Sequence, residues 1–314
     1  MRNPWLKWTI LEGLCKASNR NINKLIGSFI KVYPEAIFLI TLIVGVIQGL
    51  GGLIGALSRK KSLRLPLPQM VKSVLFGITA SIMSILTVYT FTDPRADVGV
   101  STLIVSMAII PGTFVDRWLF RDPALKKRQW FAILIFLLSG YAALNFPSLA
   151  GLGQLPFWVW LSVMIALMAT ANETITRFQS KTAADAAPVD PMVHVAWIGL
   201  TTVIFTAIGS TIFNAWHLFK ILPQLALSAA AATGIIVIAM VIFKLISYYG
   251  GAKIGIKKLV LYSSYLILAS VMGWLFYGEA ITVGKVIGIS GFFLAFSLMD
   301  NETWQAITNR RVRS

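Results

Sequence analysis

Long apolar stretches follow one another along the chain, and polar positions are largely confined to the short segments between them. Crossing the hydrocarbon core of a bilayer as an α-helix takes about 20 apolar residues in a row. Nine stretches are close to that length or longer, at 33–57, 70–92, 98–120, 129–146, 156–176, 192–214, 223–249, 257–278 and 283–299. The pattern predicts an all-α integral membrane protein, because a helix satisfies its own backbone polar groups in lipid.

The opening stretch, 5–24, is ambiguous because charged side chains interrupt it. On a helical wheel of about 100° per residue, its polar side chains share one face: Thr9, Glu12, Lys16, Asn19, Arg20 and Asn23. One structure that fits is a tenth span whose polar face lines a water-filled cavity. The other is an amphipathic helix that lies in the membrane interface.

The basic residues of the loops indicate an orientation, since Lys and Arg are enriched in cytoplasmic loops. If the chain end after 299 is cytoplasmic, most basic loop residues fall on that side, at 59–64, 121–128, 177–181 and 253–258. Lys244, late in its span, is then expected to snorkel to the same surface. Nine spans would leave the basic N-terminal segment outside, whereas a tenth returns it to the cytoplasm. We therefore expect about ten spans with both termini cytoplasmic, in the inner or plasma membrane.

Composition fits this class. Of the 314 residues, 57% are hydrophobic and 13% charged, and the mean hydropathy is +0.76; soluble domains carry about 25% charged residues. The net charge of +16 would suggest nucleic-acid binding in a soluble protein. Here the basic residues lie between apolar runs, where they contact lipid headgroups. We expect membrane lipids as partners, and no nucleic acid. A single cysteine and two scattered histidines give no reason to expect a disulfide, a metal site or a cofactor.

The chain contains a weak internal repeat. Residues 5–24 align without gaps on 158–177, with identities at Trp5/Trp158, Leu14/Leu167, Asn19/Asn172 and Ile22/Ile175. Later matches keep the same order, pairing Pro68-Gln69 with Pro223-Gln224 and Trp118-Leu119-Phe120 with Trp274-Leu275-Phe276. We therefore expect two five-helix repeats, 1–150 and 151–314, the second ending in a short cytoplasmic tail. An odd number of spans inverts the second repeat, an arrangement typical of carriers whose site lies at mid-membrane between the repeats.

Two segments resemble a known family. The stretch Val271-Met-Gly-Trp-Leu-Phe-Tyr-Gly-Glu-Ala-Ile-Thr282, followed by 285–289, is similar to the EamA-type signature of the drug/metabolite transporter superfamily. That signature is an apolar span ending in Gly-Glu, a turn with threonine and a Gly-rich last span. The first half shows a similar pattern at Pro111, 118–123 and 129–133, although Asp122-Pro123 replaces the Gly-Glu pair.

The resemblance implies ten helices, cytoplasmic termini and a central cavity lined by the first, third, fourth, sixth, eighth and ninth helices. It implies structural roles for Pro111, Gly278, Glu279 and Gly288. Members of the family move amino acids, nucleotide sugars, sugar phosphates, cations or drugs, so the resemblance does not select a solute.

Polar side chains inside the predicted spans are the candidate solute ligands. Glu12 and Lys16 are one helical turn apart and can pair; at membrane depth such charges face a cavity or a partner, and Glu12 can also carry a coupling proton. Asn172 and Glu173 either bind a polar group of the solute or cap their helix and meet Arg177. The other candidates offer an amide, hydroxyls or rings: Asn19, Tyr89, Tyr262, Ser263 and Tyr265.

Sequence motifs of enzymes, such as His-Glu-x-x-His, Gly-x-Ser-x-Gly or a phosphate-binding loop, are absent. We predict a secondary transporter that moves a small solute, a metabolite or drug-like molecule, by alternating access. A coupling proton or a counter-substrate would drive it, and not ATP. Two alternatives stay open: a membrane-embedded enzyme acting on a lipid-like substrate, and a non-transporting scaffold or sensor with a carrier fold.

Overall fold

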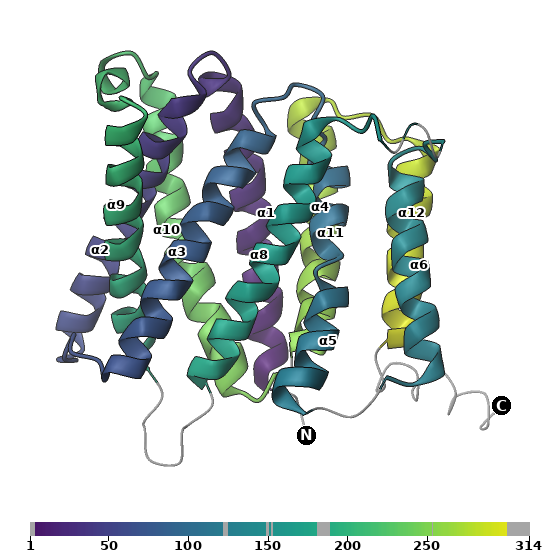
Figure 1. The fold of residues 1–314 in the computed structure, drawn as a ribbon, viewed down its shortest axis with the longest axis horizontal. Helices are drawn as coiled ribbons and strands as arrows, with labels where there is room; N and C mark the ends of the chain where they lie inside the picture. The colour runs from purple at the N-terminus through teal and green to yellow at the C-terminus, as the bar shows by residue number, and fades with distance from the viewer. Residues whose placement is uncertain are drawn as a thin grey trace.

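The structure, a computed structural model, describes residues 4–121, 125–148, 151, 153–180, 189–252 and 254–299. The regular elements within these ranges are helices, and the long ones stand side by side (Figure 1). They are α1 (Pro4–Ile30), η1 (Pro34–Ala36), α2 (Ile37–Ser58), α3 (Leu67–Thr90), α4 (Val98–Ser106), α5 (Ile109–Phe120), α6 (Lys127–Ala143), α8 (Phe157–Ser180), α9 (Pro191–Ile212), η2 (Trp216–Lys220), α10 (Gln224–Tyr249), α11 (Ile254–Tyr277) and α12 (Val283–Met299).

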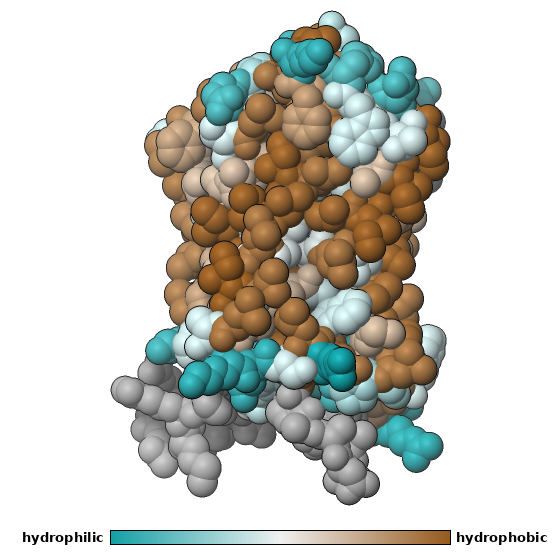
Figure 2. Space-filling model, turned by 90° about the vertical axis from the view of Figure 1, so that its left-hand side faces the viewer, coloured by the Kyte–Doolittle hydropathy of each residue, from teal (hydrophilic) through white to brown (hydrophobic). Residues whose placement is uncertain are grey.

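Within the part of the chain that the structure describes, 7 helical segments are long and apolar enough to cross a membrane. They are Pro34–Ser58, Leu67–Thr90, Val98–Phe120, Phe157–Gln179, Pro191–Ile212, Gln224–Tyr249 and Val260–Tyr277. α12 adds a shorter apolar helix. Figure 2 shows a broad apolar belt between two polar ends on one side of the molecule. These features confirm the prediction of an all-helical, membrane-embedded protein.

α1 is not one of those segments, yet it lies within the bundle. It packs along α10 and α11 (Figure 1), and its Thr9, Glu12 and Ala17 are fully buried. Its 27 residues make a rod about 40 Å long at the helical rise of about 1.5 Å per residue. The polar face found on the helical wheel is therefore turned toward the other helices.

The segment 98–120 is interrupted between Ser106, where α4 ends, and Ile109, where α5 begins. Pro111 accounts for the break, because proline has no N–H to donate to the carbonyl four residues earlier and its ring crowds that carbonyl. At the break, the carbonyl of Ala108 accepts a hydrogen bond from the backbone N–H of Gly112 at 3.1 Å. The same carbonyl also accepts hydrogen bonds from side chains of α8 and α11, so the break supplies a polar group to the interior.

Helices that are distant in sequence pack together: α2 against α9, α6 against α12, α1 against α10 and α11, and α3 against α8. α2 and α9 come close because small residues line their contact, as is common between membrane helices. A Cβ added to Gly52 would lie 2.8 Å from the carbonyl carbon of Val195. The largest group of buried apolar side chains lies where α4, α8 and α11 meet and extends to α6 and α12.

The start of α1, the end of α12 and the loop between α2 and α3 lie at the same end of the bundle, the lower end in Figure 1. We call this the basic end, because that loop exposes Arg59, Lys60, Lys61 and Arg64. The expected cytoplasmic tail and Asp122-Pro123 lie outside the described residues.

Candidate solute-binding site

Five charged side chains from four helices meet inside the bundle: Glu12 and Lys16 of α1, Glu173 of α8, Lys244 of α10 and Lys257 of α11. We call them the charge network. Lys257 Nζ lies 2.7 Å from Glu12 Oε2 and 3.1 Å from Glu173 Oε2. Lys16 Nζ is 3.2 Å from Glu12 Oε1 and 3.6 Å from Glu173 Oε1. Lys244 Nζ is 3.2 Å from Glu173 Oε1. The side chain of Lys16 is 12% exposed, and the other four are at most 3% exposed.

Buried cations outnumber buried anions in this region. Ionised groups are costly to bury unless oppositely charged partners surround them. In the charge network two carboxylates face three ammonium groups, and Glu173 also accepts a hydrogen bond from the Tyr248 hydroxyl at 2.5 Å. Next to Lys257, the fully buried Lys258 donates to the Ala108 carbonyl and the Thr170 hydroxyl, both at 2.9 Å. Among the described residues, no acidic side chain pairs with Lys258.

Two small cavities that share lining residues have volumes of about 50 and 60 Å³, and Lys16 of the charge network lines the first. The first is lined by side chains of α1, α3, α4, α8, α10 and α11, among them Lys16, Asn19, Arg20, Thr87, Tyr262 and Tyr265. The second extends toward α2 and α9 and is lined by Thr41, Gln48, Ser81, Ser84 and Thr202, among others. Asn19 and Thr87 border both, as do two methionines, so we treat them together as the central cavity. Each has room for only a few water-sized groups.

Arg20 is the most unusual lining residue. It is 3% exposed, one of its Nη atoms donates a hydrogen bond to the hydroxyl of Ser101, and its guanidinium carbon lies 5.0 Å from the centroid of the Phe91 ring. Its Nε donor has no hydrogen-bond partner among the described residues. Arg20 is thus a buried cation whose described hydrogen-bond and ring partners, Ser101 and Phe91, are neutral.

The structure brings most of the predicted site residues together. Lys16, Asn19, Tyr262 and Tyr265 line the central cavity, and the rings of the two tyrosines lie 5.9 Å apart. Glu12 and Glu173 belong to the adjoining charge network. Asn172 is also buried, and neither polar atom of its amide has a hydrogen-bond partner in the described part of the chain. It lines neither half of the cavity.

Two predicted residues lie elsewhere. Tyr89 is 39% exposed and packs edge-on against Phe157, with ring centroids 6.4 Å apart. It borders a separate groove with Asp93 and Arg95 beyond the end of α3. Ser263 is half-buried and does not line the central cavity.

Three lysines of the site were missed by reasoning from the sequence. Lys257 and Lys258 were expected in a cytoplasmic loop, but both are fully buried in α11. Lys244 was expected to snorkel, but it is 3% exposed and bound to Glu173. The interpretation that Glu173 meets Arg177 is also wrong for this structure, because Arg177 pairs with Asp116 and Glu173 with lysines. The signal that could have found the lysines is the pair of predicted intramembrane glutamates, which require buried cations.

A second ion network, which includes Glu279, lies 12 residues further along α1 than Glu12, about 18 Å from the first network by helical rise. Glu279 accepts a hydrogen bond from the Val98 backbone N–H at 2.6 Å, at the start of α4, and lies 2.6 Å from Lys24 Nζ. Lys285 Nζ is 2.7 Å from Asp97 Oδ2 and 3.6 Å from Glu279 Oε2. We call Lys24, Asp97, Glu279 and Lys285 the distal network.

Two of the glycines that the resemblance predicts to be structural occupy positions that favour glycine for local reasons. Gly278 has φ +63°, a conformation that other residues rarely adopt, where α11 ends. A Cβ on Gly288 would lie 2.7 Å from the Ser139 carbonyl oxygen, because α12 packs tightly on α6.

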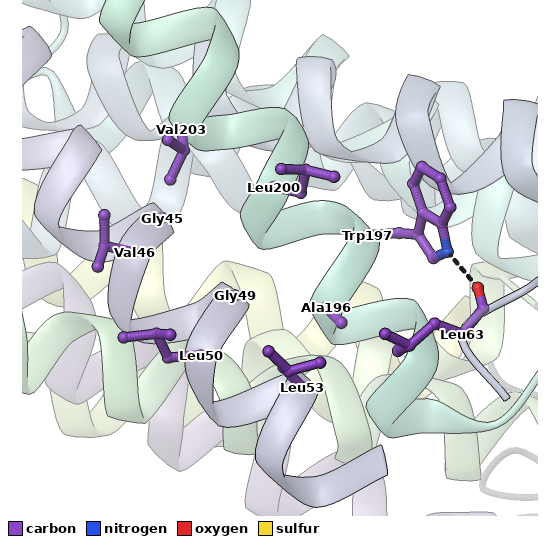
Figure 3. Close-up of a pocket in the computed structure, with 10 residues that line it drawn as sticks. All are labelled: Gly45, Val46, Gly49, Leu50, Leu53, Leu63, Ala196, Trp197, Leu200 and Val203. Atoms are coloured by element: carbon purple, nitrogen blue, oxygen red, sulfur yellow. Dashed lines mark hydrogen bonds between the residues drawn. The ribbon is translucent and has the colours of Figure 1, made fainter. Parts of the chain in front are cut away.

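A larger groove of about 400 Å³ lies between α2 and α9 and is almost entirely apolar. Figure 3 shows its lining, in which Gly45, Gly49 and Leu50 face Ala196 and Leu200. The indole N–H of Trp197 donates to the Leu63 carbonyl at 2.9 Å, so it is not available to a solute. The groove offers no charge to recognise a polar molecule. We take the central cavity as the candidate solute site because polar and charged side chains from six helices of the bundle line it.

Comparison with known proteins adds evidence for the fold. No family model matches the chain, and no curated protein matches it in sequence. A solved structure described only as the crystal structure of a protein has a TM-score of 0.63 to this chain. The match covers 94% of this chain and 98% of the other at 16% sequence identity. At that identity the likeness shows the fold alone.

Proposed function

We propose that the protein is a secondary transporter that moves a small solute across the membrane by alternating access between two inverted five-helix halves. The observation that carries this proposal is the central cavity. A polar, charged space is enclosed in a bundle of apolar helices, and its walls come from α1, α3 and α4 on one side of the repeat boundary and α8, α10 and α11 on the other. Carriers place their solute site in this position.

The helix packing supports two equivalent halves. Exchanging α1 with α8, α2 with α9, α3 with α10, α4 and α5 with α11, and α6 with α12 maps the main contacts onto one another. The α1–α10 contact becomes α8–α3, α1–α11 becomes α8–α4, and α2–α10 becomes α9–α3; all six contacts occur. The α2–α9, α4–α11 and α6–α12 contacts map onto themselves. The alignment of 5–24 on 158–177 is this same exchange of α1 with α8.

The two ion networks could act as gates on the two sides of the proposed solute site. The charge network lies toward the start of α1 and the distal network toward its end, with Asn19 and Arg20 of α1 between them. Ion pairs between helices can separate and reform when one half rocks against the other. A carrier needs such contacts on both sides of its site, so that only one side is open at a time.

Transport can be tested with the purified chain in liposomes. We expect uptake of at least one radiolabelled solute from a panel of amino acids, carboxylates, sugar phosphates and organic cations. Preloading the liposomes with unlabelled solute should accelerate uptake, because a carrier exchanges solutes faster than it returns empty. Asn19→Phe, which fills the central cavity, should abolish uptake.

The matched control is Leu14→Phe, which introduces the same side chain on the exposed face of α1, where Leu14 is 40% exposed. It should retain uptake. If folded protein took up no solute of the panel, either into empty liposomes or into preloaded ones, the scaffold or sensor alternative would replace the transporter proposal.

A further inference from the structure

We infer that the solute is an oxyanion, a carboxylate or phosphate group, and that Lys16 and Arg20 hold it in the central cavity. This inference rests on the proposed function, and it goes further by naming the chemical class of the solute. It starts from the sign of the charges that face the cavity. Lys16 and Arg20 line it together with hydroxyl, amide and aromatic groups, and no Asp or Glu among the described residues lines either half.

Arg20 gives the strongest reason for an anionic ligand. A guanidinium buried at membrane depth is costly without a partner of opposite charge. The lysines of the charge network have carboxylates within 3.6 Å, whereas the described partners of Arg20 are a hydroxyl and an aromatic ring. Its Nε is a buried donor without a hydrogen-bond partner among the described residues, and Arg20 is one of the residues that line the cavity. An oxyanion supplies both the missing charge and an acceptor, in the geometry that a guanidinium binds best.

Lys16 is placed to bind the same group. It precedes Arg20 by four residues on α1, so the two side chains lie on one face of the helix, and both line the cavity. Its contacts with the carboxylates, at 3.2 and 3.6 Å, are longer than those of Lys257, at 2.7 and 3.1 Å. Lys16 can therefore turn toward a solute while Lys257 and Lys244 continue to neutralise Glu12 and Glu173.

A cationic solute would face two positive charges and no carboxylate in this cavity. A neutral solute would leave Arg20 without a counter-charge. The size of the cavity also favours a compact group, since each half holds only a few water-sized groups in this conformation.

The test measures binding and transport separately on the full-length protein. Thermal stabilisation in detergent should be saturable with at least one of acetate, succinate, inorganic phosphate and glycerol 3-phosphate at constant ionic strength. Chloride, choline and glucose should not stabilise it. Because each cation makes charge-assisted hydrogen bonds, Arg20→Gln and Lys16→Gln should each raise the dissociation constant about tenfold or more. Arg20→Lys, which keeps the charge, should lose less.

The matched control is Lys7→Gln, which removes an exposed lysine of the same helix and should leave binding unchanged. If chloride stabilised the protein equally, or Lys7→Gln weakened binding as much, the effect would be general screening and the inference would be overturned. Uptake of cations or neutral solutes alone would also overturn it while leaving the transporter proposal intact.

The opposite result separates the two proposals as well. Oxyanion binding that depends on both residues, without uptake or exchange in liposomes, would support the site and refute transport. If folded protein neither bound nor took up any oxyanion of the panel, the inference would be overturned. Carboxylate and phosphate arms of the panel identify which oxyanion the site prefers.

Discussion

Glu173→Gln is the sharpest perturbation of the charge network, because Glu173 has the most partners. Its carboxylate lies within 3.6 Å of the ammonium groups of Lys16, Lys244 and Lys257 and accepts the Tyr248 hydroxyl hydrogen bond. The substitution keeps the shape of the side chain and removes its charge. Glu12 is then the only carboxylate of the network left to face three buried lysines.

The expected loss of stability follows from that imbalance. Removing one partner of a buried ion pair costs about 3–5 kcal/mol, because the other charge stays buried without compensation. Lys244 provides a matched control, because its acidic partner in the described structure is Glu173. Lys244→Met in the Glu173→Gln background removes the uncompensated cation and should recover a substantial part of the loss. Lys244→Met alone should cost less than Glu173→Gln, because Lys16 and Lys257 still neutralise Glu173.

The assay is equilibrium unfolding of all four proteins in one mixed detergent, followed by a double-mutant cycle. We expect a coupling free energy of 0.5–3 kcal/mol between the two sites, the range for residues that share a network. Additive losses would refute the charge-balance reasoning. So would a cost below about 1 kcal/mol for Glu173→Gln, the size expected of an exposed ion pair.

Three further perturbations address other parts of the molecule. Asp97→Cys and Lys285→Cys can be combined in a variant that lacks the native cysteine. Joining the two new cysteines with a short, reductively cleavable bifunctional thiol reagent should stop transport. A reductant that cleaves the link should restore it. Gly52→Ala and then Gly52→Val should lower stability progressively, each by about 1–3 kcal/mol because overpacking forces α2 from α9, as measured by unfolding; equal stability of all three would refute the close contact. The Arg95 side chain donates hydrogen bonds to Asp93 and lowers its pKa, so Arg95→Gln should raise that pKa in a carboxyl NMR titration. The stabilisation from this pair is present above the ordinary pKa of an aspartate and is lost as the pH falls through the lowered value.

The fold was largely predictable, and its errors have a physical cause. Hydropathy located the helices because lipid requires long apolar runs, and the predicted span 223–249 is nearly identical to α10. The rule that places basic residues in cytoplasmic loops failed at Lys257 and Lys258, which lie in α11. That rule treats every lysine alike, whereas the position of these two depends on carboxylates and carbonyls of other helices. Sequence periodicity contains no information on such tertiary partners.

The candidate site was predictable where helical geometry alone determines which side chains share a face of the helix. The helical wheel placed Lys16, Asn19 and Arg20 together, and all three line the cavity. Tyr89 was predicted on chemistry alone. It follows Thr87 by two residues, about 200° around a helix, so when Thr87 faces the cavity Tyr89 must face away.

Lys16 belongs to the charge network and also lines the central cavity. In the proposed transporter, it could therefore couple solute binding to the opening of one side of the site. Without solute, Lys16 contributes two of the five short contacts among the lysines and glutamates. An oxyanion that draws Lys16 toward Arg20 removes a link that joins α1 to Glu173 of α8, which are equivalent helices of the two proposed halves. Lys257 still holds Glu12 and Glu173, so the network is weakened without being left with an uncompensated carboxylate. In the proposed transporter, the binding energy of the solute would thereby loosen one side of the site, which is what a carrier requires of its solute.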